Sequence, residues 1–224
     1  MKILVFTKNC PAWRPDFCAN KKMKVMHNTA QLLESLHQQT ESFLQKAIGE
    51  WQMLPPEVLA TKPSLEKWSA AQCLEHLNIY GRYYLPAIEK AVQEAKRKGS
   101  RSTENFHSGW LGDYFAKLMR PKPDGHLKSK MKAPKNAVPS ADPDARTMLA
   151  EFIDQQETML RLLADAASVN LSRARAPISI MPWLRLKLGD TFLFVTAHIE
   201  RHILQAERAI EAAKQPVAHF GISA

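Results

Sequence analysis

The sequence predicts an all-α protein, a four-helix bundle with long connections between its helices and a poorly ordered N-terminal extension. Four long segments carry apolar residues at the three- and four-residue spacing of amphipathic helices. No stretch longer than about five residues alternates between apolar and polar residues as a half-buried strand would. With 224 residues, of which 45% are apolar, the chain is long enough to bury a core without disulfides.

The first two helices have clear boundaries in the sequence. The first is predicted over 29–51, and the prolines at 55–56 end it because proline cannot continue a helix. The second starts with SAAQ at 69–72, a capping box in which the serine and glutamine side chains bind the first free backbone N–H groups. This helix is predicted to run to Lys98 and to stop at Gly99, a residue common at helix ends.

The third and fourth helices complete the predicted bundle. The third is expected to begin at Asp142 as N-cap, with Pro143 in the first helical position, and to run to Ala167. The fourth is expected to begin near Gly189 and to run to Lys214. Both carry their apolar residues on one side, so each has a face that a partner helix can cover.

Long connections and polar ends separate and flank these helices. Residues 100–120 are predicted to be a loop with a short helix over 112–119, and residues 168–188 a connector that contains two prolines. The predicted organisation is an N-terminal extension (1–26), a helical domain (27–215) with an exposed basic loop (120–141), and a C-terminal tail (216–224).

The net charge of +9 is concentrated in two segments. Residues 1–24 and residues 120–135 each carry a net charge of +5, which leaves about −1 for the rest of the chain. Basicity confined to a tail and a loop is more typical of solvated segments than of a nucleic-acid-binding face. We therefore expect no specific nucleic-acid partner.

Other composition features exclude a membrane span and favour a reducing compartment. No apolar run approaches the roughly 18 residues that a spanning helix needs. The three cysteines, at positions 10, 18 and 73, match no zinc or disulfide spacing. A cytoplasmic location is the simplest prediction.

Three histidines are the strongest functional signal. His198 and His202 lie four residues apart on the fourth predicted helix, so both imidazoles project from one side of it. His76 lies on the apolar face of the second predicted helix. Three imidazoles that face one bundle interior would together bind a divalent cation and leave coordination positions open. The alternative is that each ring is an ordinary buried histidine that has a hydrogen-bond partner.

Neighbouring residues offer supporting roles but no clear acid or base. The metalloprotease pattern His-Glu-x-x-His is absent, and Glu200 is predicted to point away from the histidine pair. Candidates for orienting a ligand or lining a pocket are Gln205, Tyr80, Tyr83 and Arg201, although Arg201 by itself is more typical of a solvated flank.

Two motifs resemble those of the DinB-like superfamily. WSAAQCLEHL at 68–77 is similar to its second-helix motif, and GDTFLFVTAHIERHILQ at 189–205 is similar to its fourth-helix motif. The resemblance implies an up-up-down-down-like four-helix bundle with a three-histidine metal site, at His76, His198 and His202. It also implies nickel, zinc or iron as the ion, water in the open positions, and homodimers.

The same resemblance implies a function that acts on a small-molecule substrate. Members of the superfamily are often described as metal-dependent hydrolases, and some relatives are S-transferases that use a low-molecular-weight thiol. A bundle that binds a metal or ligand without catalysis is the third alternative. The residues alone do not decide among these alternatives, and they name no substrate.

Overall fold

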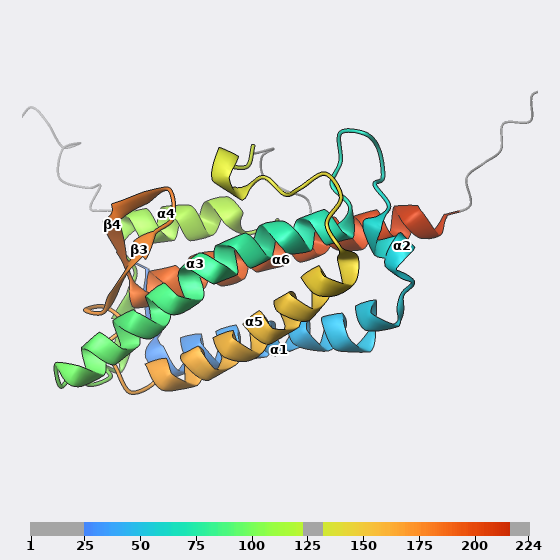
Figure 1. The fold of residues 1–224 in the computed structure, drawn as a ribbon. Coiled ribbons are helices and arrows are strands. Elements are labelled where there is room, and N and C mark those ends of the chain that lie inside the picture. The colour runs from blue at the N-terminus through green and yellow to red at the C-terminus, as the bar shows by residue number, and fades with distance from the viewer. Residues whose placement is uncertain (1–24, 123–131, 216–224) are drawn as a thin grey trace, which may run out of the picture.

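The computed structural model of the chain describes residues 25–122 and 132–215. In this part of the chain four long helices form the bundle that the sequence predicts (Figure 1). The predicted tail 216–224 and nearly all of the predicted N-terminal extension lie outside the described residues. The four long helices are α1 (Thr29–Gly49), α3 (Ala70–Arg97), α5 (Ala145–Ala166) and α6 (Leu188–Lys214).

Shorter elements connect and cap the bundle. Two antiparallel pairs of strands are present, β1 with β2 and β3 with β4. The shorter helices are η2 (Trp51–Met53), α2 (Pro56–Ala60), α4 (Trp110–Met119) and η3 (Lys135–Ala137). The strands are β1 (Met26–Asn28), β2 (Asn105–His107), β3 (Arg175–Ile178) and β4 (Met181–Lys187).

Two ion pairs between the long helices show which of these helices run in the same direction. Lys46 and Glu207 pair at 2.7 Å near the ends of α1 and α6, so these two helices run the same way. Lys96 and Asp165 pair at 2.6 Å near the ends of α3 and α5, which also run together but in the opposite direction (Figure 1). The chain order is therefore up-down-down-up, and the up-up-down-down order that the resemblance implied is wrong. The parallel helices α3 and α5 are joined by the longest connection in the chain. Two parallel helices need such a long connection, because the chain must return to the opposite end of the bundle before the second helix begins.

Local side chains explain where three of the helices start. Ser69 and Gln72 form the predicted capping box of α3, each side chain accepting from the other's backbone N–H. Asn28 caps α1. The N-cap of α5 is Asp144, which accepts from the N–H of Thr147 at 2.7 Å. The predicted cap at position 142 is therefore wrong by two residues.

Strands occupy three segments in which no strand was predicted, namely 26–28, 105–107 within the predicted loop 100–120, and 175–187. The β3–β4 hairpin lies in the connector 168–188, where Pro177 and Pro182 favoured a loop. Both prolines are accommodated because β3 and β4 each have only one partner, which leaves one edge of each strand unpaired. Met26, placed in the N-terminal extension, begins β1 and pairs with His107.

The core lies between the four long helices and is closed at one end by α4 and the strands. Phe152 of α5 and Ile88 of α3 are fully buried within it. Burial raises the pKa of the Cys73 thiol, which also lies in this core. None of the described helices combines the length and the apolar character that a membrane crossing needs.

A close contact between α4 and α6 gives a first prediction about stability. A Cβ atom at Gly112 would lie 2.3 Å from the Cβ and Cγ atoms of Asp190. Asp190 is held in place, since it accepts hydrogen bonds from the Gly109 N–H and from the Ser108 hydroxyl. Gly112→Ala is therefore expected to lower the free energy of unfolding by about 1–3 kcal/mol, measured by urea denaturation.

Gly49→Ala is the matched control for this prediction. No atom lies within 4 Å of a Cβ built at Gly49, which is the last residue of α1. Alanine favours the helix more than glycine does, so this variant should unfold at an equal or higher urea concentration. Equal stability of the Gly112→Ala and Gly49→Ala variants would contradict the proposed clash.

Candidate metal centre

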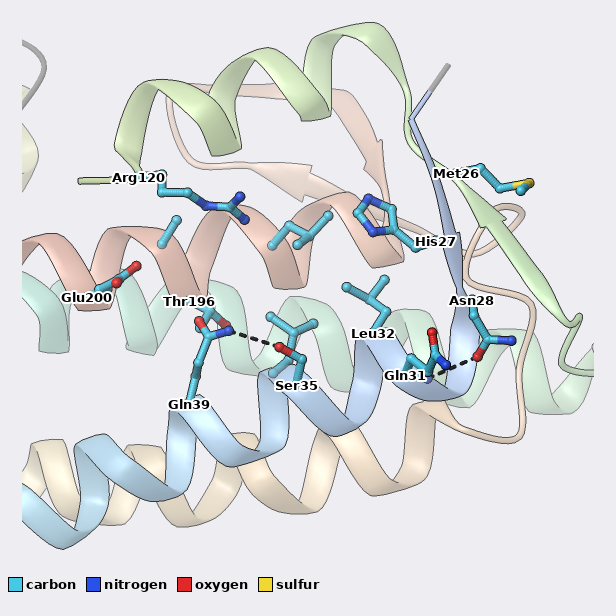
Figure 2. A pocket seen from close by; sticks show the side chains of 13 residues that line it. Met26, His27, Asn28, Gln31, Leu32, Ser35, Gln39, Arg120, Thr196 and Glu200 are labelled. Carbon is cyan, nitrogen blue, oxygen red and sulfur yellow. Dashed lines mark hydrogen bonds between the residues drawn. The ribbon is translucent and has the colours of Figure 1, made fainter. Parts of the chain in front are cut away.

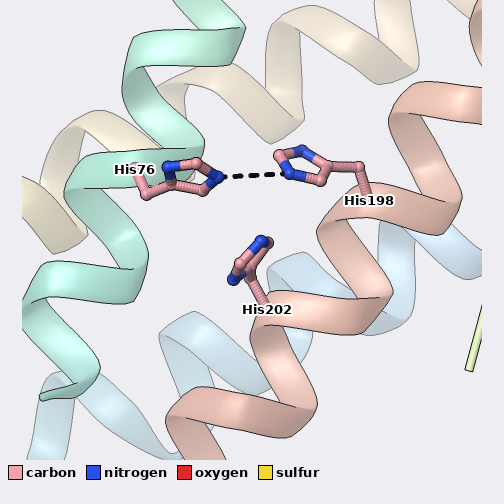
Figure 3. A group of neighbouring side chains, drawn as sticks. All are labelled: His76, His198 and His202. Carbon is pink, nitrogen blue, oxygen red and sulfur yellow. Dashed lines mark hydrogen bonds between the residues drawn. The ribbon is translucent and has the colours of Figure 1, made fainter. Parts of the chain in front are cut away.

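Three imidazole rings meet between α3 and α6 (Figure 3). His76 comes from α3, and His198 and His202 come from successive turns of α6. The ring centres lie 4.5–5.1 Å apart, and one ligand nitrogen from each ring lies within 4.8 Å of the other two. The i, i+4 spacing on α6 and the antiparallel approach of α3 together produce this arrangement.

Hydrogen bonds to oxygen atoms orient two of the rings. His76 Nδ1 lies 2.6 Å from the carbonyl oxygen of Ala137, and a carbonyl can only accept, so Nδ1 carries the hydrogen. His202 Nδ1 lies 3.1 Å from Oε1 of Gln205 and donates to it in the same way. Both rings therefore keep an Nε2 lone pair. The Nε2 atoms of His76 and His198 are 3.2 Å apart.

Burial keeps the three rings neutral. Their exposed fractions are 3%, 4% and 8% for His76, His198 and His202. Desolvation is the largest cause of the lowered pKa at each ring, because a charged imidazolium would lose its hydration. It lowers the pKa of His202 to about 3, and that of His198 well below its ordinary value. A neutral ring is the form that binds a metal ion.

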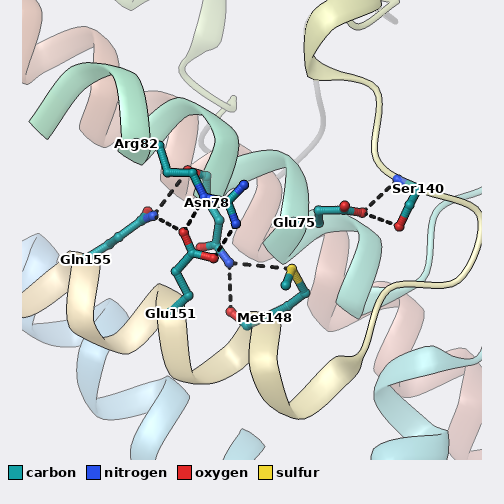
Figure 4. A network of polar contacts seen from close by, with 7 residues as sticks. All are labelled: Glu75, Asn78, Arg82, Ser140, Met148, Glu151 and Gln155. Carbon is teal, nitrogen blue, oxygen red and sulfur yellow. Dashed lines mark hydrogen bonds and ion pairs between the residues drawn. The ribbon is translucent and has the colours of Figure 1, made fainter.

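The segment from 132 to 141 covers the rings. Besides the Ala137 carbonyl, Ser140 fastens this segment to α3, because its N–H and hydroxyl both donate to Glu75, at 2.7 and 2.9 Å (Figure 4). Gln72 donates to the Ser140 carbonyl at 2.8 Å. Ala137 and Pro139 are buried, so the expectation of an exposed loop is wrong there. Residues 123–131 of that loop lie outside the described residues.

Polar contacts between α3 and α5 hold the helix that carries His76. Arg82 of α3 binds Glu151 of α5 through two guanidinium nitrogens, and Asn78 donates to the Met148 carbonyl at 2.9 Å (Figure 4). Gln155 of α5 donates in return to the Asn78 carbonyl. These contacts fix α3 against α5 on the side away from the imidazoles.

Aromatic side chains surround the three rings. Trp68, just before α3, lies 5.1 Å from the His76 ring and stacks on His202 at 5.9 Å. Phe194 stacks on His198 at 6.0 Å, one helical turn before it. Neither was predicted as a site residue. The spacing of four between Phe194 and His198 was a usable signal, whereas the position of Trp68 depends on the approach of the two helices.

The predicted supporting residues have different positions. Gln205 binds His202, and Tyr80 packs against both His76 and His198, with ring centres 5.0 and 4.4 Å apart. Burial raises the pKa of Tyr80 to about 12, so its hydroxyl stays protonated. Tyr83 is not part of the cluster, because its hydroxyl donates to the Ile178 carbonyl of the β3–β4 hairpin at 3.2 Å.

Arg201 is buried rather than solvated. Only 5% of it is exposed, which contradicts the interpretation as a solvated flank. Its positive charge contributes to the lowered pKa of both His198 and His202. Desolvation lowers the pKa of Arg201 itself. The three rings thus lie close to a buried guanidinium.

Two cavities lie on opposite sides of α6. A small one of ≈ 20 Å³, room for about one water molecule, is lined by His198, Tyr80 and Gln156. The larger one, ≈ 360 Å³, lies between α1 and α6 and is lined by Glu200 and Thr196 (Figure 2). Its lining includes none of the three histidines. Glu200 therefore faces away from the rings and is not a base for chemistry there.

Comparison with known proteins gives one match. A family model described as the DinB superfamily matches residues 27–206. This range contains the three histidines and all four long helices, apart from the last residues of α6. Comparisons with curated proteins and with solved structures found no match.

Proposed function

Because the chain belongs to the DinB superfamily, we propose that it is a metal-dependent hydrolase whose divalent ion is held by His76, His198 and His202. The single observation that carries the proposal is the meeting of three buried neutral imidazoles, two of which are oriented through Nδ1. The proposed substrate is a small molecule, since the site lies inside a helical bundle beneath a short covering segment.

One pair of donor atoms has the separation expected for two ligands of a first-row divalent ion. Metal–nitrogen distances of about 2.0–2.1 Å separate two adjacent ligand nitrogens by roughly 2.8–3.4 Å in octahedral or tetrahedral geometry. The Nε2 atoms of His76 and His198, 3.2 Å apart, lie within this range. Imidazole ligands suit zinc, nickel and iron. Hydrogen bonds from metal-binding imidazoles to a carbonyl oxygen are typical of such sites, because they fix ring orientation.

The residues around the rings have distinct proposed roles. A divalent ion bound there would polarise a substrate oxygen and lower the pKa of water in its open positions. The Ala137 carbonyl and Gln205 orient His76 and His202. Trp68 and the covering segment 132–141 exclude bulk water, which strengthens electrostatic interactions inside the site.

Arg201 favours a second candidate within the same site, thiol-dependent S-transfer. A buried guanidinium next to His198 and His202 adds positive charge to that of a divalent ion. Both charges would stabilise the thiolate of a low-molecular-weight thiol over the thiol. The two candidates share the metal and differ in whether a thiol is consumed.

One assay separates the candidates. The purified chain is loaded with zinc, nickel or iron and supplied with a panel of activated esters and amides, with and without glutathione. The hydrolase proposal predicts product formation without thiol that His202→Ala abolishes. Activity that appears only with glutathione would replace hydrolysis by S-transfer. If the chain bound one metal ion but showed neither hydrolysis nor S-transfer, it would be a metal-binding bundle without catalytic activity.

A further inference from the structure

A second concave site lies where α3 ends beside the β3–β4 hairpin. Its volume is ≈ 630 Å³. Three chain segments line it: the last turns of α3 with the loop after it, the residues that lead into β3 together with its first residue, and β4. Five basic side chains and one carboxylate, Glu94, are in the lining. The basic residues are Lys98, Arg101, Arg173, Arg175 and Arg185.

These five cations are not matched by acidic side chains. Among the residues that the structure describes, no ion pair involves any of them. The seam between α3 and α5 is different, since Lys96 pairs with Asp165 and Arg161 pairs with Glu89. The cations between α3 and α5 are therefore paired with carboxylates, whereas the five cations that line the cavity form no ion pair with the described residues.

The register of the hairpin places like charges together. Arg175 of β3 and Arg185 of β4 lie on the same outer face as diagonal neighbours, because Arg175 is opposite position 187 and Arg185 lies two residues before that position. The inner face carries buried Ala176 and Leu186, so the cations cannot turn inward. An anionic ligand in the cavity would offset the repulsion between Arg175 and Arg185.

A structural role explains only part of the cluster. Lys98 and Arg101 lie at the C-terminal end of α3, whose partial negative charge favours cations. Gly99, with φ of +66°, ends the helix there. The three arginines of the 173–185 segment are not at a helix C-terminus, and their presence at the same cavity has no such explanation.

The geometry points to a binding site for a compact anion with two or more phosphate groups, made by the cations around this cavity. Four of the five are arginine, whose planar guanidinium binds phosphate oxygens through two parallel hydrogen bonds. A cleft lined by one sign of charge concentrates counter-ions of the other. The volume is that of a small-molecule site.

The lining also argues for a small ligand over a nucleic acid strand. Proteins that bind single strands combine a basic groove with aromatic side chains on which bases stack. No aromatic residue lines this cavity. The site lies outside the two basic segments of the sequence, at 1–24 and 120–135, and it is independent of the three histidines.

Calorimetric titration of the full chain tests the proposal. Fructose 1,6-bisphosphate is the probe, fructose 6-phosphate the one-phosphate comparison, and a 20-nucleotide single strand the nucleic-acid alternative. We expect the bisphosphate to bind at least about tenfold more tightly than the monophosphate. The double variant Arg175→Gln with Arg185→Gln should weaken bisphosphate binding at least about tenfold, because two charged contacts are lost.

The matched control removes two charges elsewhere. Lys62 and Lys67 are exposed, lie between α2 and α3, and are absent from the cavity lining. The Lys62→Gln with Lys67→Gln variant should bind the bisphosphate as the unmodified chain does. An equal loss in this control, or no detectable bisphosphate binding, would overturn the proposal. Binding of the oligonucleotide alone, dependent on Arg175 and Arg185, would replace it with a nucleic-acid surface.

Discussion

Replacement of His76 by alanine is expected to lower the affinity of the chain for zinc or nickel at least about a hundredfold. The reason is that the two remaining rings, both on α6, supply only two of three nitrogen ligands. Loss of a hydrogen-bond partner behind a ligand costs about ten- to a hundredfold, so loss of a ligand should cost more. Competition with a chromogenic chelator measures the affinity, and elemental analysis measures the metal content.

Two variants calibrate this result. His37→Ala removes an imidazole from the surface of α1, where it lies 3.6 Å from Glu41, and should leave metal affinity unchanged. Gln205→Leu keeps all three rings but removes the partner of His202 Nδ1, so an intermediate loss is expected. If His76→Ala bound metal as tightly as His37→Ala, the ion would have to be held elsewhere.

Acidification of the metal-free chain should lower its free energy of unfolding below about pH 6.5. Burial depresses the pKa of His76, His198 and His202 in the folded state, to about 3 at His202, while unfolded histidine titrates near 6.5. Between these values the unfolded chain binds more protons, so stability falls as pH falls. The slope is about 1.4 kcal/mol per pH unit for each depressed histidine.

Urea denaturation of the chelator-treated chain between pH 7.5 and 5 measures this slope. The free energy of unfolding of His202→Leu should depend less steeply on pH, because one histidine with a depressed pKa is gone. Its slope should be smaller by the contribution of about one proton. Above about pH 8 the three rings contribute almost no slope, since they are then neutral in both the folded and the unfolded state. Identical pH dependences for the two proteins would mean that His202 is protonated in the fold or exposed to water.

Much of the bundle could be predicted because its signals are local. The capping box at Ser69 and Gln72, the proline pair after α1 and the apolar spacing each depend on residues within a turn or two. The same holds for His198 and His202, whose common orientation follows from helical geometry alone. Helix direction did not follow from such signals, because it depends on how the 98–144 connection crosses the bundle.

The remaining features depend on contacts between segments far apart in the sequence. The Ala137 carbonyl reaches His76 across 61 residues, and a backbone oxygen has no sequence signal. Trp68 stacks on His202 only because α3 and α6 approach each other. The basic cavity could not be predicted because its cations come from three segments that lie far apart in the sequence, and only the fold brings these segments together. The hairpin was missed because its prolines indicated a loop.

The most direct test of a three-histidine metal centre is X-ray absorption at the edge of the bound metal in the purified, metal-loaded chain. We predict scattering from three imidazole rings at about 2.0–2.2 Å, together with lighter ligands in the open positions. The His76→Ala variant should lose one ring of this scattering or the metal altogether. A spectrum without imidazole scattering, or one that His76→Ala leaves unchanged, would contradict the account.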